Sequence, residues 1–161
     1  YLFVSPRTSV LANWEEKVVA PTYSPAITPM TDSIGYLKAP SFHSPVSQTY
    51  ISTYFSRWHQ GIDLPKPSGS PVKPITSGKV VFAGWSSLGY GNMVVVSHEL
   101  GYESLYAHLS RVDVDEGETV TSESILGGVG ATGVASGNHV HLEVHLKGGA
   151  INPLSLITIP R

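Results

Sequence analysis

Short runs of β-branched and aromatic residues dominate the chain from about residue 36 onward. Gly, Pro, Asn and Asp interrupt these runs, and no long stretch has the apolar spacing of an amphipathic helix. The expected strands cover residues 47–55, 78–85, 93–98, 102–109, 112–114, 118–120 and 139–143. This pattern predicts an all-β fold, an open two-layer antiparallel β-sandwich that resembles a barrel-sandwich domain.

Two neighbouring strands are expected to form a hairpin. Residues 93–98 and 102–109 are separated only by Glu99-Leu100-Gly101, a connection short enough for antiparallel pairing. Residues 127–133 contain four glycines, too many for a helix, and lead directly into the last expected strand.

The N-terminal part of the chain has a different character. Residues 20–29 carry prolines at positions 21, 25 and 29, a spacing that excludes helix and favours an extended connector. We therefore expect residues 1–35 to be an irregular N-terminal extension or linker and residues 36–161 to be one domain. The extension could lie across the domain as a strap or act as an inhibitory segment.

Composition narrows the possible functions. Apolar residues make up 41% of the 161 positions and charged residues 14%, so the chain can build a core. A formal net charge of −2 gives no electrostatic support for nucleic-acid binding. Because the chain has no cysteine, a metal would have to be bound by histidine and carboxylate. No run of 18 apolar residues predicts a transmembrane segment, and the start at Tyr1 is that expected of a processed form.

Two histidines in the last expected strand point to chemistry. Side chains alternate between the two faces of a strand, so His139 and His141 share one face with Glu143. Each imidazole needs partners for two ring nitrogens, and two of them fill a core less well than leucine or valine would. They are well suited to holding a metal, or to holding a metal and moving a proton.

Two further segments supply similar groups. In extended chain His59 and Asp63 share a face, and Gly61 between them leaves an open space wide enough for an ion. A surface histidine and a turn-capping aspartate would explain the same residues. His108, near the end of residues 102–109, is the third candidate. Together these residues match a catalytic zinc site, which has three protein ligands and keeps a fourth position for water or substrate.

The order of these motifs resembles that of the lysostaphin-like (LytM-type) zinc metallopeptidases, which cut peptidoglycan cross-links. The resemblance runs from about residue 55 to 153. It includes the intervening segments at residues 78–85, 89–92, 117–120, 130–133 and 152–153.

The resemblance implies a site and a reaction. His59, Asp63 and His141 would bind one zinc ion per chain in a groove, and His108 and His139 would be the catalytic residues. Which of these two acts as general base stays open. The expected activity is that of a zinc endopeptidase on peptidoglycan stem peptides or cross-bridges. Its substrate would place the protein outside the cytoplasm, and a monomer is expected.

Alternatives come from other functional classes. Residues 112–120 and 127–133 also resemble lipoyl or biotinyl carrier domains, but the carrier needs a lysine at a hairpin tip, and the turn at residues 115–117 has none. A non-catalytic cell-wall-binding or amidase-activating module would have lost ligands, whereas all five site residues are present. The native metal and the bond that is cut stay open, since His and carboxylate also suit other divalent ions.

Overall fold

The computed structural model describes residues 40–159, so the predicted extension at residues 1–35 lies outside the described part of the chain. The all-β prediction is confirmed. Within the described residues the helical segments are two 3₁₀ turns, η1 (Glu99–Gly101) and η2 (Pro153–Ser155). Neither of these turns approaches the length or the apolar character that crossing a bilayer requires, and the described residues hold no other helix.

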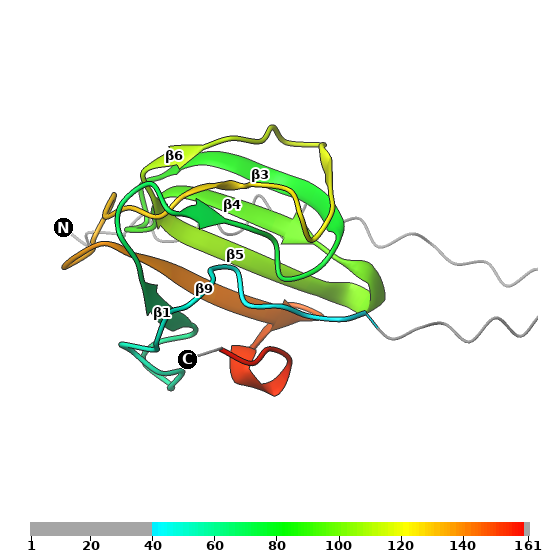
Figure 1. Cartoon of the computed structure of the whole chain (residues 1–161). Coiled ribbons are helices and arrows are strands. Elements are labelled where there is room, and N and C mark those ends of the chain that lie inside the picture. The colour runs from blue at the N-terminus through cyan, green and yellow to red at the C-terminus, as the bar shows by residue number, and fades with distance from the viewer. Residues whose placement is uncertain (1–39, 160–161) are drawn as a thin grey trace, which may run out of the picture. The chain divides into compact units, whose positions relative to one another are not determined.

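Two antiparallel sheets build the domain (Figure 1). The larger sheet has the order β1-β9-β5-β4-β3-β7, and β10 also pairs with β9. Its strands are β1 (Ile62–Pro65), β3 (Gly78–Ser86), β4 (Gly91–Ser97), β5 (Tyr102–Leu109), β7 (Thr119–Val120), β9 (His139–Leu146) and β10 (Gly149–Ile151). The smaller sheet has the order β2-β8-β6, formed by β2 (Pro71–Val72), β8 (Gly127–Gly128) and β6 (Arg111–Val112).

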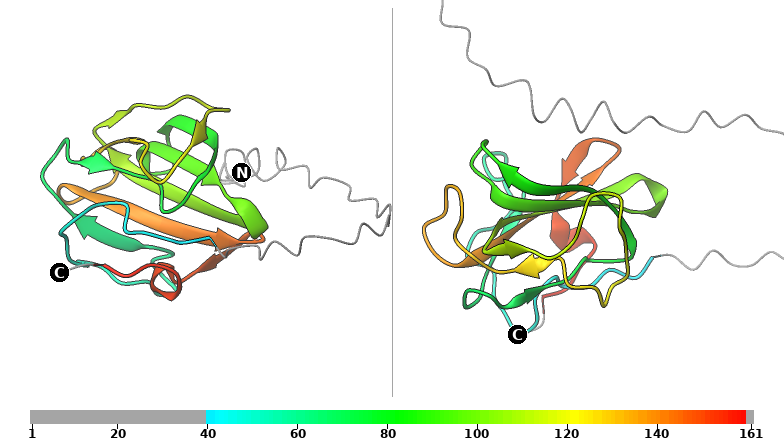
Figure 2. Two further views of the ribbon diagram at one scale, coloured as in Figure 1. Left: turned by 45° about the vertical axis from the view of Figure 1, so that its right-hand side comes forward. Right: turned by 90° about the horizontal axis from the view of Figure 1, so that it is seen from above.

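The main core lies between these two layers. Val72 and Leu126, from the segments that form or adjoin the small sheet, are fully buried in one cluster with Val94 and Val140 of the large sheet. Figure 2 shows from two further directions how the short strands and their loops cover one face of the large sheet. The opposite face of the large sheet is therefore the one available for a groove.

Strand β9 is central to the large sheet because it has strands on both sides. On one side Asp63 of β1 is the partner of His141, and on the other side Ala107 of β5 is the partner of the same histidine. Val140 and Leu142 enter the main core, so the alternation of the strand turns His141 and its odd-numbered neighbours to the opposite face.

The predicted strand at residues 47–55 is wrong. Within it only Thr53 makes an isolated bridge, to Asp63 at the edge of β1, while Tyr50 and Tyr54 are exposed. β1 is only four residues long and gives this segment too little edge to pair with. The β-branched and aromatic composition therefore favoured a strand that the available pairing partner does not support.

A β-bulge interrupts the pairing of β5 with β4 near the end of β5. Asn92 pairs with Leu109 and Val94 with Tyr106, so Met93 alone faces two residues of β5. One of these two, His108, has a φ of +61°, in the left-handed region that non-glycine residues rarely adopt. If side chains alternated strictly along β5, His108 would point into the main core on the same face as Tyr106. Because of the bulge, Leu109 enters the core instead and His108 lies at the opposite face, beside β9.

Candidate metal centre

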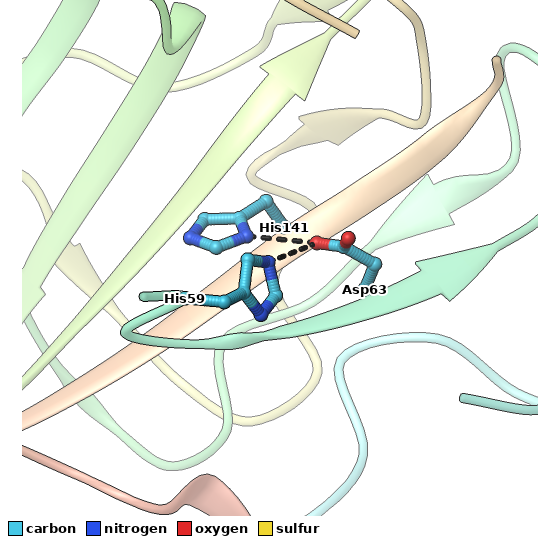
Figure 3. A group of neighbouring side chains, drawn as sticks. All are labelled: His59, Asp63 and His141. Atoms are coloured by element: carbon cyan, nitrogen blue, oxygen red, sulfur yellow. Dashed lines mark hydrogen bonds and ion pairs between the residues drawn. The ribbon is translucent and has the colours of Figure 1, made fainter. Parts of the chain in front are cut away.

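Three side chains from two distant parts of the chain meet beside β1 and β9 (Figure 3). His59 comes from a tight turn closed by reciprocal backbone hydrogen bonds with Ser56, Asp63 from β1 and His141 from β9. Asp63 Oδ1 lies 3.1 Å from His59 Nε2 and 2.8 Å from His141 Nδ1. One potential ligand atom from each residue falls within 4.8 Å of the others. The three atoms thus form a compact donor set.

The outer nitrogens of the two rings decide what the inner nitrogens can do. His59 Nδ1 faces the Tyr54 carbonyl oxygen at 3.2 Å, and His141 Nε2 faces a Glu143 carboxylate oxygen at 3.1 Å. These oxygens only accept hydrogen bonds, so each outer nitrogen carries a proton. In the neutral rings the inner nitrogens then present lone pairs toward the Asp63 oxygen. Three acceptors facing one another repel unless a cation lies between them, so the site fits a metal ion.

The charge distribution agrees with this interpretation. Burial alone would raise the pKa of Asp63, but hydrogen bonds with His141 and Thr53 hold it well below its usual range. Burial alone would lower the pKa of His141, whereas hydrogen bonds to Asp63 and Glu143 raise it to about 9. Without a metal, a proton on His141 therefore supplies the missing positive charge. A metal ion would take the place of this proton.

His108 and His139 lie side by side next to the donor set, with ring centroids 4.8 Å apart. His108 Nδ1 donates to the Thr132 carbonyl oxygen at 2.9 Å, and His139 Nδ1 donates to the Gly137 carbonyl oxygen at 2.8 Å. The Nε2 atom of each ring is consequently left as a proton acceptor. His139 Nε2 lies 3.7 Å from Asp63 Oδ1.

The surroundings of His108 favour its neutral form. Burial is the largest effect on the pKa of His108 and lowers it, and the neighbouring rings of His139 and His141 lower it further, although the bond to Thr132 opposes them. A neutral His108 can remove a proton from a group in the groove and release it later.

The sequence predicted an open space for an ion beside Gly61, but protein atoms fill this space. A Cβ atom at Gly61 would lie 2.5 Å from the Leu142 carbonyl oxygen and 2.7 Å from His141 Cε1. The absent side chain therefore makes room for the His141 ring itself, which can then approach Asp63.

A groove of about 580 Å³ contains all five predicted site residues. Its buried part is polar, whereas its rim is mixed: Trp58 is 83% exposed and Val134 82% exposed, and Arg57, Gln60 and Ser136 are exposed beside them. Arg57 stacks over the Trp58 ring, 4.4 Å from its centroid. Four histidines and the carboxylates of Asp63 and Glu143 therefore line the groove beneath a rim of apolar and polar side chains, an arrangement suited to binding a polar ligand.

Sequence reasoning missed the residues that hold the histidines in place. Tyr54, Thr132 and Gly137 act through backbone carbonyls, which any residue type provides, so their sequence carries no signal for this role. Tyr90, which donates to Glu143, lies in the Gly-Tyr-Gly-Asn segment, and only the three-dimensional structure shows that contact.

The sequence is similar to those of known peptidases and of a hydrolase activator. Residues 57–153 match the family model described as Peptidase family M23. The DD-carboxypeptidase/endopeptidase Mpg of Neisseria meningitidis serogroup B is 42% identical over 100 residues, which cover 62% of this chain and 23% of Mpg. The murein hydrolase activator NlpD of Salmonella dublin is 34% identical over 96 residues, which cover 60% of this chain and 25% of NlpD. The chain thus spans about a quarter of the length of these curated relatives.

Solved structures agree with the family match. A putative peptidase M23 from Pseudomonas aeruginosa superposes with a TM-score of 0.65 and 38% identity, covering 70% of this chain and 48% of the other. The catalytic domain of lysostaphin from Staphylococcus simulans superposes with a TM-score of 0.57 and 35% identity, covering 60% of this chain and 77% of the other.

Proposed function

Because this chain belongs to peptidase family M23, we propose that it is a zinc-dependent endopeptidase that hydrolyses peptide bonds of peptidoglycan. The observation that carries the proposal is the arrangement around Asp63. Two histidine nitrogens with inward lone pairs meet its carboxylate, and the Nε2 atoms of two further histidines are left free as proton acceptors beside it. The names of the relatives support the substrate class.

His59, Asp63 and His141 would hold the zinc ion. Zinc bound by three protein ligands acts as a Lewis acid on a carbonyl and lowers the pKa of water from about 15.7 to roughly 7. The carboxylate of Asp63 offsets part of the positive charge of the ion. The backbone of β1 and β9 fixes the positions of two of the three ligands through direct pairing of Asp63 with His141.

His108 and His139 would move the protons. The Nε2 atom of one ring takes a proton from the attacking water as a new C–O bond forms at the scissile carbonyl. The proton then passes to the amide nitrogen, so that the C–N bond breaks and a neutral amine leaves. The second imidazole, after taking up a proton from solvent at Nε2, stabilises the negative charge that develops on the carbonyl oxygen and keeps this proton through the step. Either histidine can fill either role.

The similarity to NlpD favours a second candidate, an activator of a separate murein hydrolase. Such a protein needs a binding groove but no acid–base residues. The retention of His108 and His139 with correctly anchored rings makes the peptidase the stronger proposal. Either function would place the protein outside the cytoplasm, where peptidoglycan lies.

Digestion of purified peptidoglycan, followed by separation and mass spectrometry of the muropeptides, tests the proposal. Endopeptidase activity converts cross-linked dimers into monomers, chelation abolishes the conversion, and added zinc restores it. Loss of only a terminal D-alanine would indicate a carboxypeptidase. An unchanged pattern with the zinc-loaded protein, combined with faster cleavage when a murein amidase is added, would favour the activator.

A further inference from the structure

We propose that Glu143 is a positioning residue that fixes the ring orientation and tautomer of His141, so that His141 offers Nδ1 to the metal. This inference deepens the proposed function, because it rests on the same metal centre.

Glu143 lies two residues after His141 on β9, with its side chain turned to the same face. The residue is only 4% exposed, and both carboxylate oxygens are occupied. Oε1 accepts hydrogen bonds from Tyr90 Oη at 2.7 Å and from His141 Nε2 at 3.1 Å. Oε2 accepts one from His145 Nε2 at 2.7 Å. Three donors therefore hold this carboxylate in one orientation.

Position in the sheet explains why His141 needs a side-chain partner. The other three histidines of the groove are anchored by backbone carbonyls, those of Tyr54, Thr132 and Gly137. His141 lies inside a strand that is paired on both sides, with β1 and with β5. Backbone carbonyls there are engaged in the ladders and point along the sheet, whereas the ring stands away from it. An acceptor for Nε2–H must come from a side chain on the same face.

The chemistry of the carboxylate selects one tautomer. An ionised carboxylate only accepts, so His141 Nε2 must carry a proton, and in the neutral ring that would bind a metal Nδ1 keeps its lone pair. That lone pair points toward Asp63 Oδ1 at 2.8 Å, the place where the ligand atoms converge. In a free neutral imidazole the populations of the two tautomers differ only by about a factor of a few. The hydrogen bond to Glu143 therefore decides which nitrogen of His141 binds the metal.

Packing alone does not account for a charged group at this position. Leu105, the partner of Glu143 on β5, belongs to an apolar cluster on the same face, and an apolar side chain would extend this cluster. Burying a carboxylate costs free energy that its hydrogen bonds only offset. Its hydrogen bond to His141 explains why a charged group is present where packing alone would favour an apolar one.

Tyr90 connects this anchor to the catalytic side of the groove. Its hydroxyl donates to Glu143, while its backbone carbonyl accepts a hydrogen bond from the His108 backbone N–H at 2.8 Å. One residue thus supports both the carboxylate behind His141 and the bulge that carries His108.

Zinc affinity and histidine NMR of the full chain test the proposal. In the zinc-loaded wild type, long-range ¹⁵N–¹H spectra should show His141 coordinated through Nδ1 with a proton on Nε2. Glu143→Leu should weaken zinc binding about 10–100-fold in a chelator competition. Glu143→Gln keeps an acceptor oxygen for Nε2–H and should restore most of the affinity. Tyr90→Phe should cost only a few-fold.

The control is Glu99→Leu, which removes an exposed carboxylate from η1, between β4 and β5 and outside the groove. It should leave zinc affinity within about twofold of wild type, which separates positioning from a general loss of negative charge. Coordination of His141 through Nε2 in the wild type would overturn the proposal even if Glu143→Leu fails to fold, and so would unchanged affinity in that variant. None of these measurements depends on peptidase activity, so a zinc-binding protein that fails to cleave peptidoglycan would refute the proposed function alone.

Discussion

Asp63 and His141 are separated by 78 positions in the sequence, yet they are direct partners across β1 and β9 and their side chains lie 2.8 Å apart. The hydrogen-bond register of two strands therefore sets the distance between two ligand atoms. A shift of this register by one residue would turn one of the side chains to the other face. The spacing of these two candidate ligands is consequently as rigid as the sheet that carries them, whereas His59 depends on the turn with Ser56.

Substitution of the groove residues should separate metal binding from acid–base chemistry. Asp63→Ala and His141→Ala remove ligand atoms and should lose bound zinc together with activity. His108→Ala and His139→Ala should keep the metal and lower kcat about 10²–10⁴-fold, the usual contribution of a general acid or base. Metal analysis of the purified variants and assay on peptidoglycan measure both effects. Equal loss of zinc in all four would show that the roles are assigned wrongly.

Gly61→Ala should weaken zinc binding without removing a ligand. The new methyl group would lie 2.5 Å from a backbone oxygen and 2.7 Å from His141 Cε1, so the ring must move away from Asp63. Overpacking of this kind usually costs about 1–3 kcal/mol of folding free energy. Gly137→Ala is the matched control, because no atom lies within 4 Å of the position that its methyl group would take. Chelator competition and urea unfolding should distinguish the pair, and identical affinities would contradict the steric argument.

Thr132→Val should lower kcat while leaving zinc content unchanged. The Thr132 hydroxyl donates to the Leu109 carbonyl oxygen at 2.7 Å and accepts from the Asn92 N–H at 3.0 Å, which fixes the loop whose carbonyl anchors His108. Valine keeps the shape and removes both bonds, and although the Leu109 carbonyl keeps its bond from Asn92 Nδ2, the loss of a partner for the Asn92 N–H should cost about 1–3 kcal/mol. Thr132→Ser retains the hydroxyl and should behave like wild type. A variant with normal kcat would mean that the bulge alone holds His108.

Trp58→Ala should raise KM for peptidoglycan fragments and leave zinc affinity as it is. The indole is almost fully exposed on the rim of the groove, where it stacks with Arg57. Removing an exposed side chain should change the free energy of unfolding by less than about 0.5 kcal/mol. Steady-state kinetics with a soluble muropeptide measure the effect, and an unchanged KM would exclude the rim from substrate binding.

His98 should make stability depend on pH independently of the metal centre. It is buried against Ser77 and Ser104, and burial lowers its pKa from the ordinary 6.5, although the hydrogen bond to the Ser77 carbonyl opposes this. As the pH falls below about 6.5, the unfolded chain binds a proton before the folded one does. The stabilisation is therefore complete above this value and is lost as the pH falls through the lowered pKa of the folded state.

Urea unfolding of the chelated protein between pH 8 and pH 5 measures this dependence. His98→Gln should be less stable at pH 8 and should show a shallower loss toward pH 5. The exposed His43 provides the control, since His43→Gln should follow the wild-type curve. Parallel curves for wild type and His98→Gln would assign the acid sensitivity to other groups.

Local patterns predicted the parts of the site that depend on local geometry. Period-two alternation correctly placed His139, His141 and Glu143 on one face of β9, and composition correctly predicted the all-β class. Two features depend on distant parts of the chain and were not predictable in this way. The bulge opposite Met93 reverses the orientation of His108, and residues 47–55 lack a strand partner of sufficient length.

The Gly61 prediction illustrates the same limit. The absence of a side chain signals that something must approach closely, but the sequence does not say which group. The group proves to be the ring of a residue on another strand, brought there by register. The five residues that sequence reasoning named all line the groove, and their roles stay predictions. Most of their anchors are backbone carbonyls, which no residue type indicates.

One face of β9 carries valine and leucine, and the other carries histidine and glutamate. This separation has an evolutionary consequence. Mutations at odd positions would erase reactivity while the even positions continue to specify the same architecture. A gene duplicate could thus lose the proposed hydrolysis in a few steps and persist as a folded domain with another function. Inert descendants of an active ancestor are an expected outcome of this strand design.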